Sequence, residues 1–275
     1  MTDYTNDPLW WAWSDSRLVT TLDRAGCAAL RVLPLDGRSA SLTRRWRSLV
    51  HRGRRVECPV CGGRFRHFAH RWNDRGVICW DCGSEERHRA LWLFLTRRRP
   101  ELLGGATALL HFAPEPAFEA RLRDRAGLRY VTCDIDPEPG SLRIDIMDVD
   151  LPDASFDAIV CAHVLEHVPD DRKAMRELYR VLEPGGWCAV MVPIAPYLEK
   201  TDEDPAVTDP EERRRRFWQE DHVRLYAEAD VPARLEAAGF AVERYAPADL
   251  APADDAERFR LGGFGSEIFL CRKAA

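Results

Sequence analysis

The chain has 275 residues, of which 45% are hydrophobic, and its formal net charge at pH 7 is −5. This length can hold one large domain and a smaller one. No apolar run approaches the roughly 18 residues of a membrane span, and the N-terminus lacks the basic start and apolar stretch of a secretion signal. We therefore expect a cytoplasmic protein with no membrane partner, whose nine cysteines are thiols or metal ligands rather than disulfides.

Charge is unevenly distributed along the chain. Residues 43–99 contain 15 arginines and 5 acidic residues, so the remainder is strongly acidic. A basic block of this kind attracts phosphates, nucleic acid or an acidic partner. A solvated face that pairs with the chain's own acids explains the same composition, so charge alone does not identify a partner.

Residues 1–55 are predicted to form a mainly helical extension. Helical spacing is found from Leu18 to Leu30 and again, in a basic segment, from Arg44 to Arg55. Ahead of both lie three tryptophans, Trp10, Trp11 and Trp13. Clustered tryptophans pack or dock more often than they line a pocket, and a lid over a substrate is the alternative role.

Four cysteines form the most specific local pattern. They lie in two C-x-x-C knuckles, seventeen residues apart and each followed by glycine: Cys58, Cys61, Cys79 and Cys82. Four thiolates at this spacing supply a tetrahedral site, and the glycines allow tight turns beneath the metal. We predict a structural Zn²⁺ ion, because four protein ligands leave no open position. A [4Fe–4S] cluster and a redox dithiol pair are the alternatives.

Residues 56–100 are therefore predicted to be a zinc-binding module and the helix that links it to the next domain. That helix is expected to begin with Ser84 as its N-cap and Glu85 and Glu86 in its first turn.

From Thr107 onward, apolar runs alternate with helical patterns. The expected strands are 109–113, 128–135, 142–147, 156–164, 187–194, 240–245 and 267–271, and the main helices are 117–126, 170–182 and 228–238. Such alternation indicates a parallel sheet with both faces covered. We predict an α/β fold for residues 101–275, with a doubly wound, seven-stranded, mostly parallel sheet.

The first strand, turn, helix and second strand (residues 107–136) have the layout of a nucleotide-binding half-sheet. The second strand ends at Asp134, where a carboxylate suits the two hydroxyls of a ribose. The usual glycine fingerprint is replaced by His111-Phe-Ala-Pro-Glu115. A cofactor must therefore be held by a different kind of loop.

Three further motifs carry a family resemblance: Leu151-Pro-Asp-Ala-Ser-Phe-Asp157, His163-Val-Leu-Glu-His167-Val and Leu182-Glu-Pro-Gly-Gly186. In this order and spacing they resemble the signatures of class I S-adenosylmethionine-dependent methyltransferases, in particular the methyltransferase type 11-like group. A subgroup carries paired C-x-x-C-G knuckles ahead of an H-F-A-P-E loop, so the resemblance includes an N-terminal four-cysteine zinc module. It covers residues from about 56 to about 240.

The resemblance implies a cofactor site for S-adenosylmethionine at the carboxyl ends of the strands. The first loop would wrap the methionine end, Asp134 would accept both ribose hydroxyls, and residues 145–146 would meet the adenine edge. Ala162 and His163, at the end of a later strand, would line the sulfonium and the acceptor. The implied cofactor residues are His111, Phe112, Ala113, Glu115, Asp134, Ile135, Asp145, Ile146, Ala162 and His163. For Glu115, an acid placed to favour a helix N-terminus is the alternative.

The predicted function is methyl transfer to a small-molecule acceptor, in specialised metabolism, by in-line displacement. Proximity and orientation should supply most of the rate, an effect of up to ~7–11 kcal/mol. An acceptor that must lose a proton also needs a base. The candidates are His222 and His163, and His222 is favoured because its segment lies where related enzymes build an acceptor pocket.

Three other functions remain open from the sequence. An RNA methyltransferase would use the basic zinc module to hold nucleic acid. Against it, Cys161-Ala-His163 stands where a base-methylating enzyme would carry an N-P-P-Y-type motif. A zinc-bearing binding module without activity is the second alternative. A nicotinamide-dependent oxidoreductase is the third, and the missing G-x-G-x-x-G disfavours it.

Overall fold

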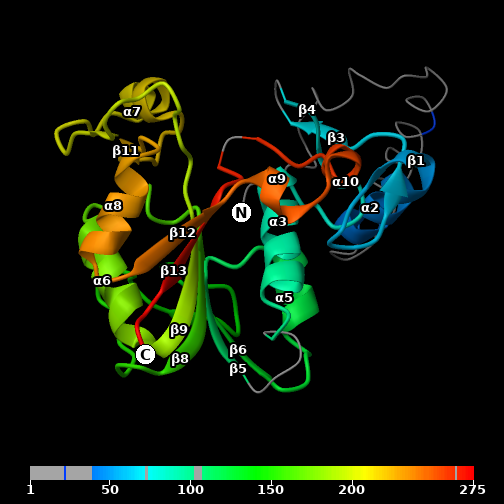
Figure 1. The fold of residues 1–275 in the computed structure, drawn as a ribbon. Coiled ribbons are helices and arrows are strands. Elements are labelled where there is room, and N and C mark those ends of the chain that lie inside the picture. The colour runs from blue at the N-terminus through cyan, green and yellow to red at the C-terminus, as the bar shows by residue number, and fades with distance from the viewer. Residues whose placement is uncertain (1–21, 23–38, 72–73, 102–106, 264) are drawn as a thin grey trace. The chain divides into compact units, whose positions relative to one another are not determined.

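The structure is a computed structural model that describes residue 22 and residues 39–275, except 72–73, 102–106 and 264 (Figure 1). The three N-terminal tryptophans and nearly all of the expected helix from Leu18 to Leu30 lie outside this part of the chain. The chain divides into two compact units, one drawn from Met1–Trp92 and Ala251–Gly262 and the other from Leu93–Leu250 and Gly263–Ala275. The predicted domain boundaries at residues 55/56 and 100/101 stay predictions.

The first unit is built from short elements around two antiparallel strand pairs. The pairs are β1 with β2 and β3 with β4. Its elements are α2 (Ser39–Val50), β1 (Arg52–Glu57), β2 (Arg64–Phe65), β3 (Ala69–Arg71), β4 (Asp74–Ile78), α3 (Glu86–Leu93) and α10 (Ala253–Arg258). Buried side chains of Val56, Phe65 and Phe68 form its centre, and α10 packs near β1.

The expected basic helix from Arg44 to Arg55 is only half right. α2 ends at Val50 and the chain then turns into β1. Extended pairing with β2 buries Val56 while the arginines on either side of Gly53 stay exposed. Helical spacing alone did not reveal this because the apolar positions of α2 and β1 fall close together in the sequence.

The second unit contains a seven-stranded sheet in the order β12-β13-β9-β8-β5-β6-β7. The strands are β5 (Thr107–Phe112), β6 (Leu128–Asp134), β7 (Leu142–Arg143), β8 (Phe156–Ala162), β9 (Leu182–Met191), β12 (Ala241–Tyr245) and β13 (Ile268–Arg272). The five strands from β7 to β9 are parallel, and β13 runs antiparallel to both neighbours. The predicted seven-stranded, mostly parallel α/β sheet is confirmed.

Helices cover both faces of this sheet. α6 (Asp171–Val181) and α8 (Asp230–Ala237) lie on one side and α5 (Pro116–Leu122) on the other (Figure 1). The side chain of Asp170 accepts a hydrogen bond from Lys173 N, which caps α6 at its start. Met175 and Leu178 of α6 are fully buried, as the amphipathic pattern predicted. The order reverses between β5 and β8, which is where ligands bind in doubly wound sheets.

The charged segment after β9 is ordered rather than irregular. It contains β10 (Asp202–Glu203), α7 (Pro210–Phe217) and β11 (Arg224–Leu225), and β10 pairs with β11. Its small core is formed by Ala195, Val207, Phe217 and Leu225. Two short elements complete the unit, η3 (Phe94–Arg98) and α9 (Pro247–Leu250). In the described part of the chain, every helix is too short or too polar to cross a bilayer.

Candidate metal centre and cofactor site

The four predicted metal ligands lie together in the first unit. Their sulfur atoms are all within 4.8 Å of one another. Cys58 Sγ lies 3.6 Å from Cys82 Sγ, and Cys61 Sγ lies 3.6 Å from Cys79 Sγ. A tetrahedron of sulfurs at a Zn–S distance of about 2.3 Å has edges of about 3.8 Å. The cluster therefore has the donor chemistry and the size that suit one tetrahedral ion.

Each knuckle is closed by its own backbone hydrogen bonds. Gly62 N donates to Cys58 O over 2.7 Å, and Gly83 N donates to Cys79 O over 3.0 Å. Both glycines adopt positive φ, +72° and +75°, where a side chain is strained. The two turns therefore follow from the C-x-x-C-G sequence itself.

Ser84 has a different role from the one predicted. α3 begins at Glu86, and the Ser84 hydroxyl lies 3.1 Å from Cys58 Sγ and 3.2 Å from Cys82 Sγ. It is fully buried beside the sulfurs instead of capping the helix. Hydrogen bonds within the cluster lower the pKa of Cys58 and raise the pKa values of Cys61 and Cys79.

Arg89 ties the second knuckle to the C-terminal part of the same unit. Its guanidinium is fully buried and donates to the backbone oxygens of Val77, Ser84, Phe259 and Arg260. Burial lowers its pKa. Four carbonyl acceptors give it a structural role, and the pattern of arginines carried no signal for that.

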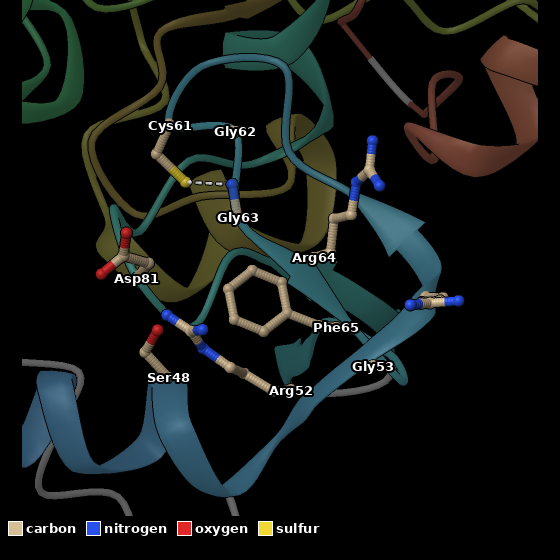
Figure 2. A pocket seen from close by; sticks show the side chains of 10 residues that line it. Ser48, Arg52, Gly53, Cys61, Gly62, Gly63, Arg64, Phe65 and Asp81 are labelled. Atoms are coloured by element: carbon tan, nitrogen blue, oxygen red, sulfur yellow. Dashed lines mark hydrogen bonds between the residues drawn. The ribbon is translucent and has the colours of Figure 1, made fainter.

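A pocket of about 400 Å³ opens beside the first knuckle (Figure 2). Its lining combines Arg52, Arg54 and Arg64 with one acid, Asp81, around the ring of Phe65. The three arginines are exposed, and Arg64 also donates to Glu57 over 2.9 Å. The pocket is therefore positively charged and accessible.

In the second unit, the sheet register brings predicted cofactor residues together at the carboxyl ends of the parallel strands. Phe112 is paired with Cys133 on one side and with Cys161 on the other. Ala113, Asp134 and Ala162 follow these three residues, so they emerge next to one another at the carboxyl ends of β5, β6 and β8. Three of the predicted contacts thus meet at the switch point of the sheet.

Contacts of the buried His111 side chain hold the loop after β5 in place. His111 is fully buried, and its Nδ1 lies 2.9 Å from the Tyr130 hydroxyl. Its Nε2 lies 3.6 Å from Glu115 Oε2. Glu115 occupies the N-cap position of α5, yet its side chain makes no capping hydrogen bond. The carboxylate faces His111 rather than the helix N–H groups, and Ala113 takes a strained φ of +48° in between.

The residues that follow β6 and β7 lie at the carboxyl ends of these strands. Asp134 Oδ1 accepts from Asp136 N over 3.0 Å, which fixes the carboxylate in a turn. Ile135 beside it is 62% exposed, an unusual position for a large apolar side chain. Asp145 Oδ1 accepts from Met147 N over 2.8 Å, and Ile146 is buried.

His163 follows β8 with φ of +55°. Its Nδ1 lies 3.2 Å from Glu166 Oε1 and its Nε2 lies 3.1 Å from Gly265 O. A carbonyl and an ionised carboxylate only accept hydrogen bonds, so both ring nitrogens act as donors. A Cβ on Gly265 would lie 2.5 Å from His163 Cε1, so only glycine fits there. Burial alone raises the pKa of Glu166, but the hydrogen bond from His163 and the charges of His163 and His167 together outweigh it, so the pKa is lowered.

His222 lies against the same turn. It is 1% exposed, and its Nδ1 donates to Phe217 O over 2.8 Å. Burial lowers its pKa, which favours the neutral ring. Ligand atoms of Glu166, His167 and His222 all lie within 4.8 Å of one another. The structure therefore places both predicted bases around one buried carboxylate that the sequence reasoning did not select.

A buried ion-pair network supports this turn. Arg224 donates to the backbone oxygens of Leu165, Val168 and Pro169. Asp171 accepts from Tyr226 and from Arg234, over 2.8 and 2.6 Å. Glu203 accepts from both arginines. These partners are 21 to 63 positions apart, so the sequence gave no sign of them. The members of the network are Asp171, Glu203, Arg224, Tyr226 and Arg234.

Comparison with known proteins bears on the second unit. Residues 117–190 match the family model described as a methyltransferase domain. The match covers about a quarter of the chain, and it includes β6, β8, α6 and most of β9. For these residues, the family resemblance found in the sequence is confirmed.

Curated relatives match over the same kind of short segment. An uncharacterized methyltransferase of Mycobacterium tuberculosis (strain ATCC 25618 / H37Rv) is 42% identical over 57 residues, which is 21% of this chain and 29% of the relative. The 27-O-demethylrifamycin SV methyltransferase of Amycolatopsis mediterranei (strain S699) is 37% identical over 67 residues, 24% of this chain and 25% of that enzyme. The chain thus spans less than a third of these relatives' length.

Among solved structures, the 1,6-didemethyltoxoflavin-N1-methyltransferase of Burkholderia thailandensis is 16% identical, with a TM-score of 0.46 over 69% of this chain and 79% of that one. The [4+2]-cyclase SpnF is 18% identical, with a TM-score of 0.47 over 78% of this chain and 90% of that one.

Proposed function

We propose that the protein is an S-adenosylmethionine-dependent methyltransferase that methylates a small-molecule acceptor. The observation that carries the proposal is the meeting of Ala113, Asp134 and Ala162 at one sheet edge, in a unit of which residues 117–190 match a methyltransferase domain. A carboxylate, a clamped acidic loop and an exposed apolar side chain stand together there. They are the groups that a ribose, an amino acid and an adenine require.

The side chains at this site suit the separate parts of the cofactor. Asp134, held by its turn, would accept the two ribose hydroxyls. Glu115, oriented by His111, would bind the methionine ammonium group. Ile135 offers an exposed apolar surface for one face of the adenine, and Asp145 with the Ile146 backbone would meet its edge. S-adenosylmethionine, when bound, supplies a methyl group on a positively charged sulfur.

The chain's own contribution would be orientation. Ala162 and His163 at the end of β8 would line the methyl group and the acceptor, and the turn of His163 is fixed by Met191 O and Gly265 O. A rigid wall on this side aligns the acceptor with the methyl carbon and the sulfur, which is the requirement for in-line displacement.

Of the two predicted bases, His222 is the one we propose acts on the acceptor. Both ring nitrogens of His163 are already engaged, one with Glu166 and the other with Gly265 O, so neither is directed to an acceptor's proton. His222 keeps a lone pair at Nε2 because its Nδ1 donates to Phe217 O. Its burial means that it acts through a group bound at Nε2 rather than by direct contact with the acceptor.

The remaining assignments follow from the same reasoning. A small-molecule acceptor of specialised metabolism is supported by the rifamycin relative, whose name states such an acceptor for that enzyme. We also propose that Cys58, Cys61, Cys79 and Cys82 bind a structural Zn²⁺ ion, supported by the spacing of their sulfurs.

Binding of S-adenosylhomocysteine to Asp134→Ala tests the cofactor assignment. Charged hydrogen bonds contribute about 1.5–3 kcal/mol each, so losing two should weaken binding by at least about 100-fold in calorimetry. The matched control is Asp136→Ala, two residues on and largely exposed, whose affinity should stay close to wild type. Unchanged affinity of Asp134→Ala would show that the cofactor lies elsewhere.

The arginine pocket favours a second candidate, an RNA methyltransferase whose basic module holds nucleic acid. The exposed side chains of Arg52, Arg54 and Arg64 suit the phosphates of a nucleic acid. RNA binding would then fall steeply with salt and would weaken in the Arg52→Ala/Arg54→Ala double variant. RNA affinity that neither salt nor these substitutions change would remove this candidate.

A further inference from the structure

Two buried acceptor atoms, one in the turn after β8 and one in the segment after α7, have no hydrogen-bond partner among the described residues. Glu166 and His222 are each 1% exposed. Glu166 Oε2 and His222 Nε2 lack a hydrogen-bond partner among the residues that the structure describes. Burying an acceptor without a partner destabilises a protein, and two such atoms in one place point to a group that is bound between them.

The hydrogen bonds of the two histidine rings indicate which nitrogen of each ring keeps a lone pair. His222 Nδ1 donates to Phe217 O, and His167 Nδ1 lies 3.2 Å from Asp221 Oδ2. A carbonyl and a carboxylate can only accept, so the proton of each ring is on Nδ1 and the lone pair is on Nε2. Metal-bound histidines are oriented in this way, with the second nitrogen donating to a carbonyl or a carboxylate.

Backbone contacts hold the two segments against each other. Val223 N donates to Glu166 O over 2.9 Å, and Arg224 donates to Leu165 O over 2.7 Å. The rings of His167 and His222 lie edge to face, with centroids 4.8 Å apart. The ligand atoms are therefore gathered within 4.8 Å by the fold itself. The His167 side chain is 34% exposed, which gives an ion a route to the cluster.

We propose that Glu166, His167 and His222 bind a divalent transition-metal ion. Two imidazole nitrogens and one carboxylate are a ligand set for Zn²⁺ and related first-row ions, and three protein ligands leave a position open. Glu166 would use Oε2 for the ion while Oε1 keeps its hydrogen bond to His163.

A metal ion at this site would take part in the proposed methyl transfer, and this catalytic role rests on the proposed function. An acceptor oxygen in the open position would lose its proton more easily, because a bound cation lowers the pKa of its ligands. The ion would then do the work predicted for a base at His222. Metal binding itself does not depend on methyl transfer and can be measured without it.

Metal content per chain tests the proposal in the full-length protein. After removal of metal, loading with Zn²⁺ and dialysis, the wild type should retain two ions per chain. Glu166→Gln and His167→Gln should each retain one. Cys58→Ser should also retain one, from the other site. Glu177→Gln is the matched control, since it makes the same substitution at a partly buried, hydrogen-bonded carboxylate on α6, and it should retain two ions.

A Co²⁺-loaded sample separates the two sites by their chemistry. The sulfur-to-cobalt absorption of the cysteine site should persist in Glu166→Gln, and the second equivalent of Co²⁺ should be absent. His167→Gln provides the same test at a part-exposed position, should the Glu166 variant fail to fold. One ion in the wild type, or two in both variants, would overturn the proposal.

S-adenosylhomocysteine affinity distinguishes this outcome from failure of the proposed function. A wild type that binds the cofactor product but holds a single ion refutes only the second metal site. A wild type that holds two ions but does not bind S-adenosylhomocysteine refutes the methyltransferase proposal and leaves the metal site standing.

Discussion

The cysteine cluster and the Glu166–His167–His222 cluster are built in different ways. The four cysteines lie within 25 consecutive positions, on two turns closed by their own glycine hydrogen bonds. The second cluster joins the end of β8 to a segment more than fifty positions later, and the surrounding sheet and ion pairs hold it in place. One is formed by local sequence, the other by tertiary packing.

The two clusters should therefore respond differently to the loss of an ion. The first unit is small and has few buried elements, so an ion bound by four thiolates would supply much of its folding free energy. The second cluster sits on a large sheet with a continuous core. Losing an ion there should change the ligand chemistry and leave the fold intact.

The largest effect is expected from Cys58→Ser. Removing one thiolate should abolish zinc binding at the cysteine cluster and unfold the first unit, since structural zinc contributes on the order of 10 kcal/mol. Metal analysis and hydrogen exchange over residues 52–92 would measure this. Cys271→Ser is the control, because Cys271 is equally buried but lies in β13 away from the cluster. If Cys58→Ser held as much zinc as the wild type, the cysteine cluster would not be a zinc site and the contrast between the two clusters would fail.

Asp171→Ala should give an intermediate effect confined to the second unit. The substitution leaves Arg234 and Tyr226 without their buried acceptor, and breaking a buried pair costs about 3–5 kcal/mol. Urea unfolding of this unit would show the loss, with the cysteine-bound ion retained.

Glu267→Ala is the control for Asp171→Ala. It removes a partly exposed partner of Arg244, and exposed pairs contribute about 0–1 kcal/mol. Equal stabilities of the two variants would mean that the buried network does not support the second cluster.

The smallest effect is a dependence of stability on pH at Glu203. Burial alone would raise its pKa, but hydrogen bonds from Arg234 and Arg224 lower the pKa to about 2. A lowered folded-state pKa stabilises the protein above the ordinary value near 4.5, and this contribution is lost as the pH falls towards 2. Urea unfolding between pH 5 and pH 2.5 should show a steeper loss for wild type than for Glu203→Gln. Parallel curves would contradict the network's role.

Much of the fold could be predicted because its signals are periodic. The alternation of strands and helices predicted the parallel sheet, and the apolar face of α6 was placed correctly at Met175 and Leu178. The boundary between α2 and β1 could not be predicted, since pairing with β2 overrides the helical spacing of that segment. Ser84 faces the sulfurs for a similar reason: contacts across the knuckle decide its position rather than helix capping.

The candidate site was predictable to a similar degree. Asp134 was selected because a carboxylate at the end of the second strand is a positional signal, and its role stays a prediction. Glu166 was missed although it stands in a quoted motif, and an acid inside the apolar run Val164-Leu-Glu-His-Val168 was the available clue. Gly265 gave no such clue, since its role depends on the His163 ring that it faces.

The sequence by itself determined the cysteine turns, because C-x-x-C-G sets hydrogen bonds and φ angles within five residues. It also determined the order of strands and helices, which follows from local periodicity. Only the tertiary structure decided which side chains share the space around Glu166. The sheet register and the ion pairs of Arg224 bring His222 to that turn, and these contacts join residues too far apart in the chain for any local pattern to specify.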